Sequence, residues 1–316
     1  CHFALCILNF TFNIMNIIGK RKIWYLISLI LIVPGIVGLI LWGLPLGIDF
    51  KGGTLLDIQY QDKSINKETI SQTIEKIGIK NANIQPGNDG AFIIRMGELD
   101  AATTQKLNEN LQSIGEYQQN RLETVGPTVS SDLKLRAIIA VGLASLAIII
   151  YIAIAFRKVP RPASSWKFGV CAVVALIHDT LFVIGVFAIL GHFFGYEVNS
   201  LFITALLTIM GFSVHDTIVV FDRIRENLLK SPSLNFETNV NNSILQTLNR
   251  SLNTSFTVLI VLLALYLLGG TNLREFVLAL LVGITIGTYS SIFNAPPLLI
   301  SWQGWTLKRM SKKVAS

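Results

Sequence analysis

Charged residues are scarce in this sequence, and cysteine is scarcer still. Asp, Glu, Lys and Arg together make up 14% of the 316 residues, whereas soluble domains average about 25%. The chain has only three cysteines, so a secreted scaffold held together by disulfides is excluded. The low charge and a mean hydropathy of +0.57 also exclude a disordered tail and an ordinary soluble enzyme. These shortages predict a polytopic membrane protein.

Signatures of bound nucleotides and metals are missing as well. The sequence contains no GxxxxGK(S/T) phosphate-binding loop, no HExxH and no cysteine pair with metal-ligand spacing. We therefore expect no cofactor, no metal site and no catalytic residue. If the protein does work, we expect its energy to come from an ion gradient rather than from ATP bound in this chain.

Long apolar segments are what the sequence does have. A bilayer core about 30 Å thick requires about 20 apolar residues of helix. Six segments meet this requirement, at residues 23–42, 137–156, 168–190, 198–221, 251–270 and 276–300. The first is long for a signal peptide and has no small-residue cleavage site after it, which favours a retained helix.

The positions of the charges predict the topology, because short cytoplasmic loops carry an excess of Lys and Arg. Basic residues precede the first segment, fill the loop at 157–167 and follow the sixth segment. The long stretch 44–136 instead has 12 acidic and 10 basic residues. Both termini are therefore expected in the cytoplasm, with 44–136 outside. The formal net charge of +7 then reflects topology and contact with membrane lipids, and we expect no nucleic acid partner.

The expected organisation has five parts. Residues 1–14 precede Met15 and form an uncertain N-terminal extension to which we assign no role. Residues 15–43 hold the cytoplasmic start and the first helix, 44–136 an external domain, 137–300 the other five helices and 301–316 a basic cytoplasmic tail.

The pattern of residues 44–136 predicts a small α+β domain. It has no catalytic or metal pattern, so its expected task is contact with another macromolecule. The order of elements is βαββαβ, a ferredoxin-like arrangement. The expected elements are strands at 54–60, 81–85, 91–95 and 117–125 and helices at 66–77 and 101–114.

Ionisable residues occur inside the apolar segments, where they are costly and usually functional. The triplet His-Asp-Thr appears at 178–180 and again 37 residues later at 215–217. At ~1.5 Å per residue, Asp179 lies roughly 17 Å and Asp216 roughly 26 Å from the start of its segment. Arg250 lies roughly 28 Å from the far end of the fifth segment. Asp216 and Arg250 therefore reach a similar depth.

This depth makes an ion pair between Asp216 and Arg250 feasible. A desolvated carboxylate tends to take up a proton and a nearby guanidinium opposes this, so such a pair can act as a proton switch. Asp179, His215 and Thr217 are candidates for an extended relay, and His178 ranks with them. The competing interpretation is a fixed ion pair with an Arg that reaches the interface.

Small residues and one amphipathic stretch complete the pattern. Gly283 and Gly287 form a GxxxG in the sixth segment, and Gly35 and Gly38 remove side-chain bulk from the first segment. Both features favour tight helix packing. Residues 234–248 carry regularly spaced apolar side chains among Asn and Ser. We expect them to form an amphipathic helix on the inner membrane surface.

Four motifs resemble the SecF family of the resistance-nodulation-division superfamily. Gly47-Ile48-Asp49-Phe50-Lys51-Gly52-Gly53-Thr54 and Val125-Gly126-Pro127-Thr128-Val129-Ser130 resemble the entry to and exit from the family's external domain. The strongest likeness is the fourth segment from Gly211 through His215-Asp216-Thr217 to Asn227. Residues 247–255, which include Arg250, are similar to the family's lead into the fifth helix.

This resemblance implies an accessory subunit of the Sec protein translocase in the bacterial cytoplasmic membrane. Such subunits pair with SecD, act beside the SecYEG channel on a translocating preprotein and use the proton-motive force. The family's proton-linked Asp falls on Asp216 and its Arg on Arg250, while a further carboxylate comes from SecD. His215 and Ser251 stand where the family commonly has Asn and Thr.

Two other classes remain open from the sequence. A proton-driven exporter of small molecules or lipids from the same superfamily usually carries two six-helix halves with large external domains, whereas here one half has one small domain. A membrane receptor or scaffold would use the buried charges only for structure. A SecD-like chain in the same complex would separate the Sec subunit from the exporter. Proton flux and export that are both indifferent to neutralising Asp216 and Arg250 together would favour the receptor or scaffold.

Overall fold

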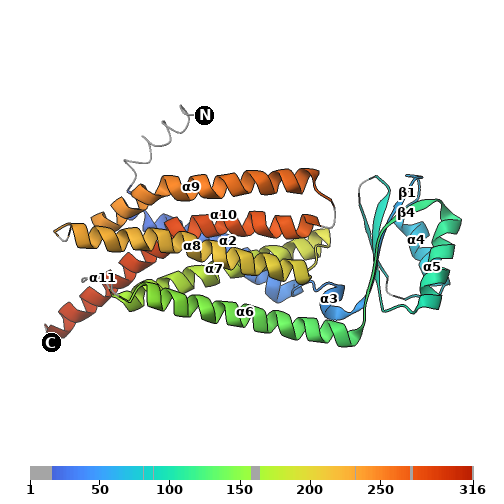
Figure 1. Ribbon diagram of the computed structural model, residues 1–316, viewed down its shortest axis with the longest axis horizontal. Coiled ribbons are helices and arrows are strands. Elements are labelled where there is room, and N and C mark those ends of the chain that lie inside the picture. Colours follow the sequence, from blue (N-terminus) through green and yellow to red (C-terminus); the bar gives the residue numbers. More distant parts are fainter. Residues whose placement is uncertain are drawn as a thin grey trace, which may run out of the picture. The chain divides into compact units, whose positions relative to one another are not determined.

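A computed structural model describes residues 16–80, 82–87, 89–157, 164–231, 233–270 and 273–314, with side chains as far as residue 306. The expected extension at 1–14 lies outside these residues. The chain divides into two units (Figure 1). Of the described residues, one unit contains those within 16–44, 141–193 and 201–314, and the other contains those within 45–140 and 194–200.

The described residues contain six helices that are long and apolar enough to cross a membrane, which confirms the six expected segments. Most are longer than the expected apolar segments. They are α2 (Arg21–Trp42), α6 (Pro127–Ala155), α7 (Ser165–Phe194), α8 (Ser200–Lys230), α9 (Phe236–Leu268) and α10 (Arg274–Phe293) with α11 (Ala295–Val314).

The expected separate amphipathic helix does not exist as such. Residues 236–248 are the first turns of α9, which continues without a break into the apolar part of the same helix. Val240, Ile244 and Leu248 are buried in the main core cluster, together with Ile224 and Leu228 of α8. The apolar face therefore packs against protein and not against the membrane surface.

The sixth apolar segment is two helices and not one. Helix α10 ends at Phe293, Asn294 lies between the helices, and α11 begins at Ala295. Pro296 and Pro297 follow at once, and a proline lacks the backbone N–H and clashes with the carbonyl four residues earlier. Prolines are tolerated in the first turn of a helix, so the chain ends one helix and starts another.

Small residues allow the helices to approach closely, as the GxxxG pattern predicts. A Cβ atom added to Gly283 of α10 would lie 2.2 Å from Cδ1 of Ile209 on α8. A Cβ atom on Gly287 would lie 3.1 Å from Cβ of Ser213 on the same helix. These contacts place α8 against the glycine face of α10.

The other unit is built on an antiparallel sheet with the expected βαββαβ succession. Its ferredoxin-like assignment stays a prediction. The sheet order is β2-β3-β1-β4, and the buried faces of the strands and helices share one apolar core, with Leu56, Ile94 and Leu107 at 0% exposure. The elements are the short helix α3 (Ile48–Lys51), β1 (Gly53–Tyr60), α4 (Lys67–Lys76), β2 (Asn83–Pro86), β3 (Ala91–Met96), α5 (Ala101–Ile114) and β4 (Tyr117–Val125).

The entry to this unit depends on two adjacent glycines. Gly52 and Gly53 have φ angles of +77° and +128°, a region that other residues rarely adopt. A Cβ atom on Gly53 would lie 2.5 Å from the carbonyl oxygen of Met96. The Gly-Gly pair therefore lets the chain leave α3 and enter β1 beside β3.

Residues 194–200, which join α7 to α8, belong to the same unit as the sheet. Val198 forms a parallel bridge with Leu46, and its carbonyl accepts from Gly47 N at 2.8 Å. Arg95 of β3 forms an ion pair with Glu197 at 2.9 Å, and both side chains are less than one-fifth exposed. The α7–α8 connection is thus fixed to the sheet unit.

Candidate functional site

Asp216 lies in the core of the helix bundle on α8, at 2% exposure. Among the described residues its Oδ2 atom has no hydrogen-bond partner. Ser251 of α9 is the hydroxyl that approaches this carboxyl group, yet its Oγ atom is also buried without a partner of ordinary geometry in the described part of the chain. Buried polar atoms are nearly always paired, so two orphan oxygens on facing helices make this site unusual.

The ion pair expected between Asp216 and Arg250 is not formed. No N–O distance of 4.0 Å or less joins Arg250 to an acidic residue among those described. Arg250 is exposed, while the next residue, Ser251, is buried at 1%. Consecutive residues on an α-helix are about 100° apart, so the face of α9 that meets α8 presents Ser251 and turns Arg250 outward.

The side of the bundle that carries Arg250 is polar. His215 on α8 and Arg250, Asn253 and Thr254 on α9 are all exposed. In the part of the chain that the structure describes, Arg250 and His215 are the cationic or chargeable groups close enough to act on the carboxyl group of Asp216. Hydrocarbon offers no hydrogen bonds to such groups. This side of the isolated chain therefore has the chemistry of a surface that another protein covers.

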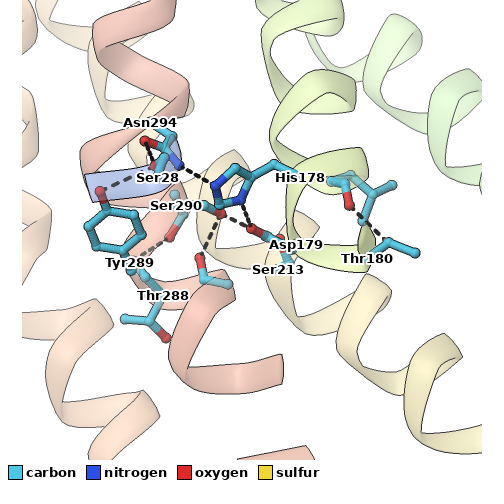
Figure 2. A network of polar contacts seen from close by, with 12 residues as sticks. Ser28, His178, Asp179, Thr180, Ser213, Thr288, Tyr289, Ser290 and Asn294 are labelled. Carbon is cyan, nitrogen blue, oxygen red and sulfur yellow. Dashed lines mark hydrogen bonds and ion pairs between the residues drawn. The ribbon is translucent and has the colours of Figure 1, made fainter. Parts of the chain in front are cut away.

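Asp179 of α7 is also buried, at 0% exposure, but its environment is the opposite of that of Asp216 (Figure 2). Its Oδ2 accepts from Ser213 Oγ on α8 at 2.5 Å and from Ser290 Oγ on α10 at 2.6 Å. Its Oδ1 lies 2.9 Å from Nδ1 of His178. Both oxygens of this carboxylate are therefore partnered.

The network continues from His178 to α2. Asn294 Nδ2 lies 3.2 Å from His178 Nε2, and Asn294 Oδ1 accepts from Ser28 Oγ at 2.8 Å. The amide can only donate to Nε2, so the imidazole proton is on Nδ1, where it is donated to Asp179. Tyr289 OH closes this end by donating to the carbonyl of Trp24 at 2.8 Å.

The two His-Asp-Thr triplets thus have different surroundings. In α7, His178 is bonded to Asp179 inside the core. In α8, His215 is exposed while Asp216 and Thr217 are buried. The structure brings Asp179 and α8 together through Ser213, and it does not bring Asp216 and Arg250 into contact.

Sequence reasoning missed the neutral partners in this network: Ser28, Ser213, Tyr289, Ser290 and Asn294. The signal was present, because each is a polar residue within an apolar segment. Hydroxyl and amide groups between membrane helices form interhelical hydrogen bonds. Searching the segments for charged residues alone overlooks them.

Six helices long and apolar enough to cross a membrane define a multi-pass membrane protein in the described residues. Its bundle core carries a carboxylate with an orphan oxygen beside a polar side of α8 and α9. In the described residues no group of three or more His, Cys, Asp or Glu side chains could hold a metal ion.

Comparison with known proteins identifies the family. The family described as protein export membrane protein SecD/SecF, C-terminal, matches residues 104–305, and the SecD/SecF GG motif matches residues 43–63. The protein translocase subunit SecF of Thermobaculum terrenum is 46% identical over 312 residues, which covers 95% of this chain and 97% of the relative. The chain belongs to the SecF family and is an accessory subunit of Sec protein translocation.

Other relatives combine two proteins in one chain. The protein translocase subunit SecDF of Bacillus subtilis is 35% identical over 300 residues, covering 93% of this chain and 39% of the relative. The crystal structure of SecDF from Thermus thermophilus, titled a translocon-associated membrane protein, matches with a TM-score of 0.82 and 34% identity. The match covers 92% of this chain and 39% of that one. The chain therefore spans about two-fifths of the SecDF proteins it resembles.

Proposed function

We propose that this chain pairs with a SecD subunit and uses the proton-motive force to promote protein translocation, with Asp216 as the group that takes up and releases the proton. The observation that carries this proposal is the orphan Oδ2 atom of Asp216, which is buried and without a partner in the described residues. A buried charge that is not paired is costly. Such a group responds to changes in its surroundings by gaining or losing a proton.

Arg250 has the second role. As an Arg, it keeps its charge at every physiological pH. It is exposed beside Asp216 but unpaired with it in the described structure. A movement that brings the guanidinium to the carboxylate favours the ionised form, and a movement away favours the protonated form. The site therefore links the position of α9 to the proton on Asp216.

The exposed polar side of α8 and α9 is where we place SecD. His215, Arg250 and Asn253 need polar partners at membrane depth. Relatives in which SecD and SecF form one chain support this partnership. A carboxylate supplied by SecD on this face would give Arg250 the partner that this chain does not provide.

We place the chain beside the SecYEG channel in the bacterial cytoplasmic membrane, with both termini in the cytoplasm and the sheet unit outside. The excess of Lys and Arg in the short loops and at the ends supports this orientation. The substrate is the translocating preprotein, which the sheet unit contacts. The chain transports and does not catalyse a covalent reaction, and a proton gradient replaces a cofactor as its energy source.

Translocation into inverted membrane vesicles tests the proposal. Vesicles contain the full chain with its SecD subunit, and completion of preprotein translocation is followed with and without an imposed proton gradient. Asp216→Asn should abolish the gradient-dependent part of translocation and leave the gradient-independent part intact. The variant keeps the shape of the side chain, so the amount of assembled complex should not change.

Asp222→Asn is the matched control, because Asp222 is an exposed carboxylate on the same helix, where it pairs with Arg225 at 2.6 Å. This control should retain the response to the gradient. An undiminished response in Asp216→Asn vesicles would refute the role of Asp216. If both variants lost the response equally, any change in the charge of α8 would abolish the response, and the effect would not be specific to Asp216.

A further inference from the structure

Two carboxylates are buried among the described residues of the bundle, and one of these two is fully bonded. Asp179 accepts from three donors on α7, α8 and α10. Asp216 instead leaves Oδ2 without a partner in the described residues. A completely satisfied polar network makes a core rigid and specific, whereas an incomplete one is costly. The two groups are therefore suited to different tasks.

One of the residues bonded to Asp179, Ser213, lies one helical turn from Asp216. Ser213, which donates to Asp179, precedes Asp216 by three residues on α8. Residues three apart lie on the same side of a helix. The bond to Asp179 therefore fixes the turn of α8 that presents Asp216.

A second bond fixes the facing turn of α9. Thr288 Oγ1 donates to the carbonyl of Ile284 at 2.9 Å, so in the 2.6 Å contact between Thr288 and Ser255 it is Ser255 that donates. Ser255 follows Ser251 by four residues and shares its face of α9. Thr288 lies two residues before Ser290, the other partner of Asp179. Helix α10 therefore holds both α8 and α9.

We infer that Asp179 is a positioning residue for Asp216. This inference rests on the function proposed above. Through Ser213 and Ser290 it fixes α8 and α10, and through the Thr288–Ser255 bond α10 fixes α9. The result is that the carboxylate of Asp216 and the hydroxyl of Ser251 are held at a spacing that leaves both oxygens without a partner. Asp179 thereby keeps Asp216 ready to exchange a proton, without carrying that proton itself.

In the described residues, the other chargeable groups that act on Asp216 are His215 on its own helix and Arg250 on α9. The His178–Asp179 pair on α7 is bonded to Ser213, one turn before Asp216. Helix α10 contributes hydroxyl groups, of which Tyr289 is the titratable one. Helix α6 brings apolar side chains to this core. A change in the proton response after loosening the Ser213 bond therefore reports the position of Asp216, since no charge is altered.

Translocation into the same vesicles, measured over a range of external pH, tests the inference. Ser213→Ala and Ser255→Ala each remove one hydrogen bond and no charge. Each should move the pH midpoint of gradient-dependent translocation by about half to one pH unit. A shift of this size is equivalent to the net free energy of one hydrogen bond. Asp179→Asn should move it at least as far. Adding Ser213→Ala to Asp179→Asn should then have little further effect, because both act through the same bond.

Ser145→Ala is the matched control. Ser145 is a half-buried membrane serine whose hydroxyl bonds to a carbonyl of its own helix, Val141 O, at 2.7 Å. It should leave the midpoint unchanged. The amount of complex and its melting temperature in detergent are measured for every variant. A loss of stability with an unmoved midpoint in Ser213→Ala and Ser255→Ala would overturn the inference and make the network a purely structural one.

The outcome for Asp216 is read separately. If Asp179→Asn abolishes gradient-dependent translocation at every pH while Ser213→Ala changes nothing, Asp179 carries a proton itself and the inference is wrong. If Asp216→Asn has no effect on the gradient response, the proposed function fails instead. If Asp216→Asn abolishes the response and the serine variants leave the midpoint in place, only the positioning role fails.

Discussion

The contact between Gly283 and Ile209 gives a prediction whose size follows from the structure. In Gly283→Ala the new Cβ atom would lie 2.2 Å from Cδ1, 2.4 Å from Cγ1 and 2.8 Å from Cγ2 of Ile209. Ordinary carbon–carbon contacts are about 3.5–4.0 Å. Ile is β-branched and has one strongly preferred χ1 rotamer in a helix, so turning the side chain does not clear all three atoms. Helices α8 and α10 must move apart by about 1 Å.

This separation has a cost that can be estimated. Overpacking a core costs about 1–3 kcal/mol, and replacing Gly by Ala in a helix returns about 0.5–1 kcal/mol. The net loss is about 1–2 kcal/mol, which corresponds to a melting temperature lower by about 2–8 °C. Gly142→Ala on α6 is the control, because nothing lies within 4 Å of a Cβ atom there. It should leave the melting temperature unchanged or raise it.

Thermal unfolding of the purified chain in detergent measures the effect. Ile209→Ala should rescue Gly283→Ala, because it removes all three atoms that the new methyl group meets. Ile209→Val should not rescue it, because Val removes Cδ1 and keeps the two Cγ positions. Equal melting temperatures for Gly283→Ala and Gly142→Ala, or equal rescue by Ala and Val at position 209, would refute this packing argument.

Two further predictions concern the sheet unit and are measured by its resistance to limited proteolysis in the full chain. Arg95→Glu should destabilise the unit by about 3 kcal/mol, because it places two carboxylates together in a mostly buried position, and adding Glu197→Arg should restore most of the loss. Burial raises the pKa of Asp57, while Asn120 and Arg121 oppose the rise. As the pH rises, Asp57 therefore loses its proton at a lower pH in the unfolded chain than in the folded chain. The stability of the sheet unit should fall as the pH rises above the ordinary carboxyl pKa of about 3.9. Asp57→Asn should flatten this dependence, and a slope that survives the substitution would show that other groups cause it.

The elements that the sequence predicts well are those with local signals. The six membrane helices follow from the length of their apolar runs, and the succession βαββαβ follows from the periodicity of 44–136. The GxxxG pattern also predicts a close contact, and Gly283 and Gly287 indeed lie against α8. In each case the information lies within a few neighbouring residues.

The features that the sequence missed depend on how helices are rotated and joined. Asp216 and Arg250 reach similar depth, but depth along a helix does not say which side of it a residue occupies. The packing of α9 turns Ser251 inward and leaves Arg250 exposed. The break at Asn294 had a local signal in Pro296 and Pro297, which the hydropathy of the whole segment concealed.

The protonation of Asp216 is the most direct measurement of how this chain uses a proton gradient. Infrared difference spectra of the chain with its SecD subunit in lipid, recorded between acidic and alkaline pH, resolve the absorption of a protonated carboxyl group. We expect a band that disappears as the pH rises and is absent in Asp216→Asn, but persists in Asp222→Asn. A difference spectrum in Asp216→Asn identical to that of the unmodified chain would contradict the assignment of Asp216 as the proton site.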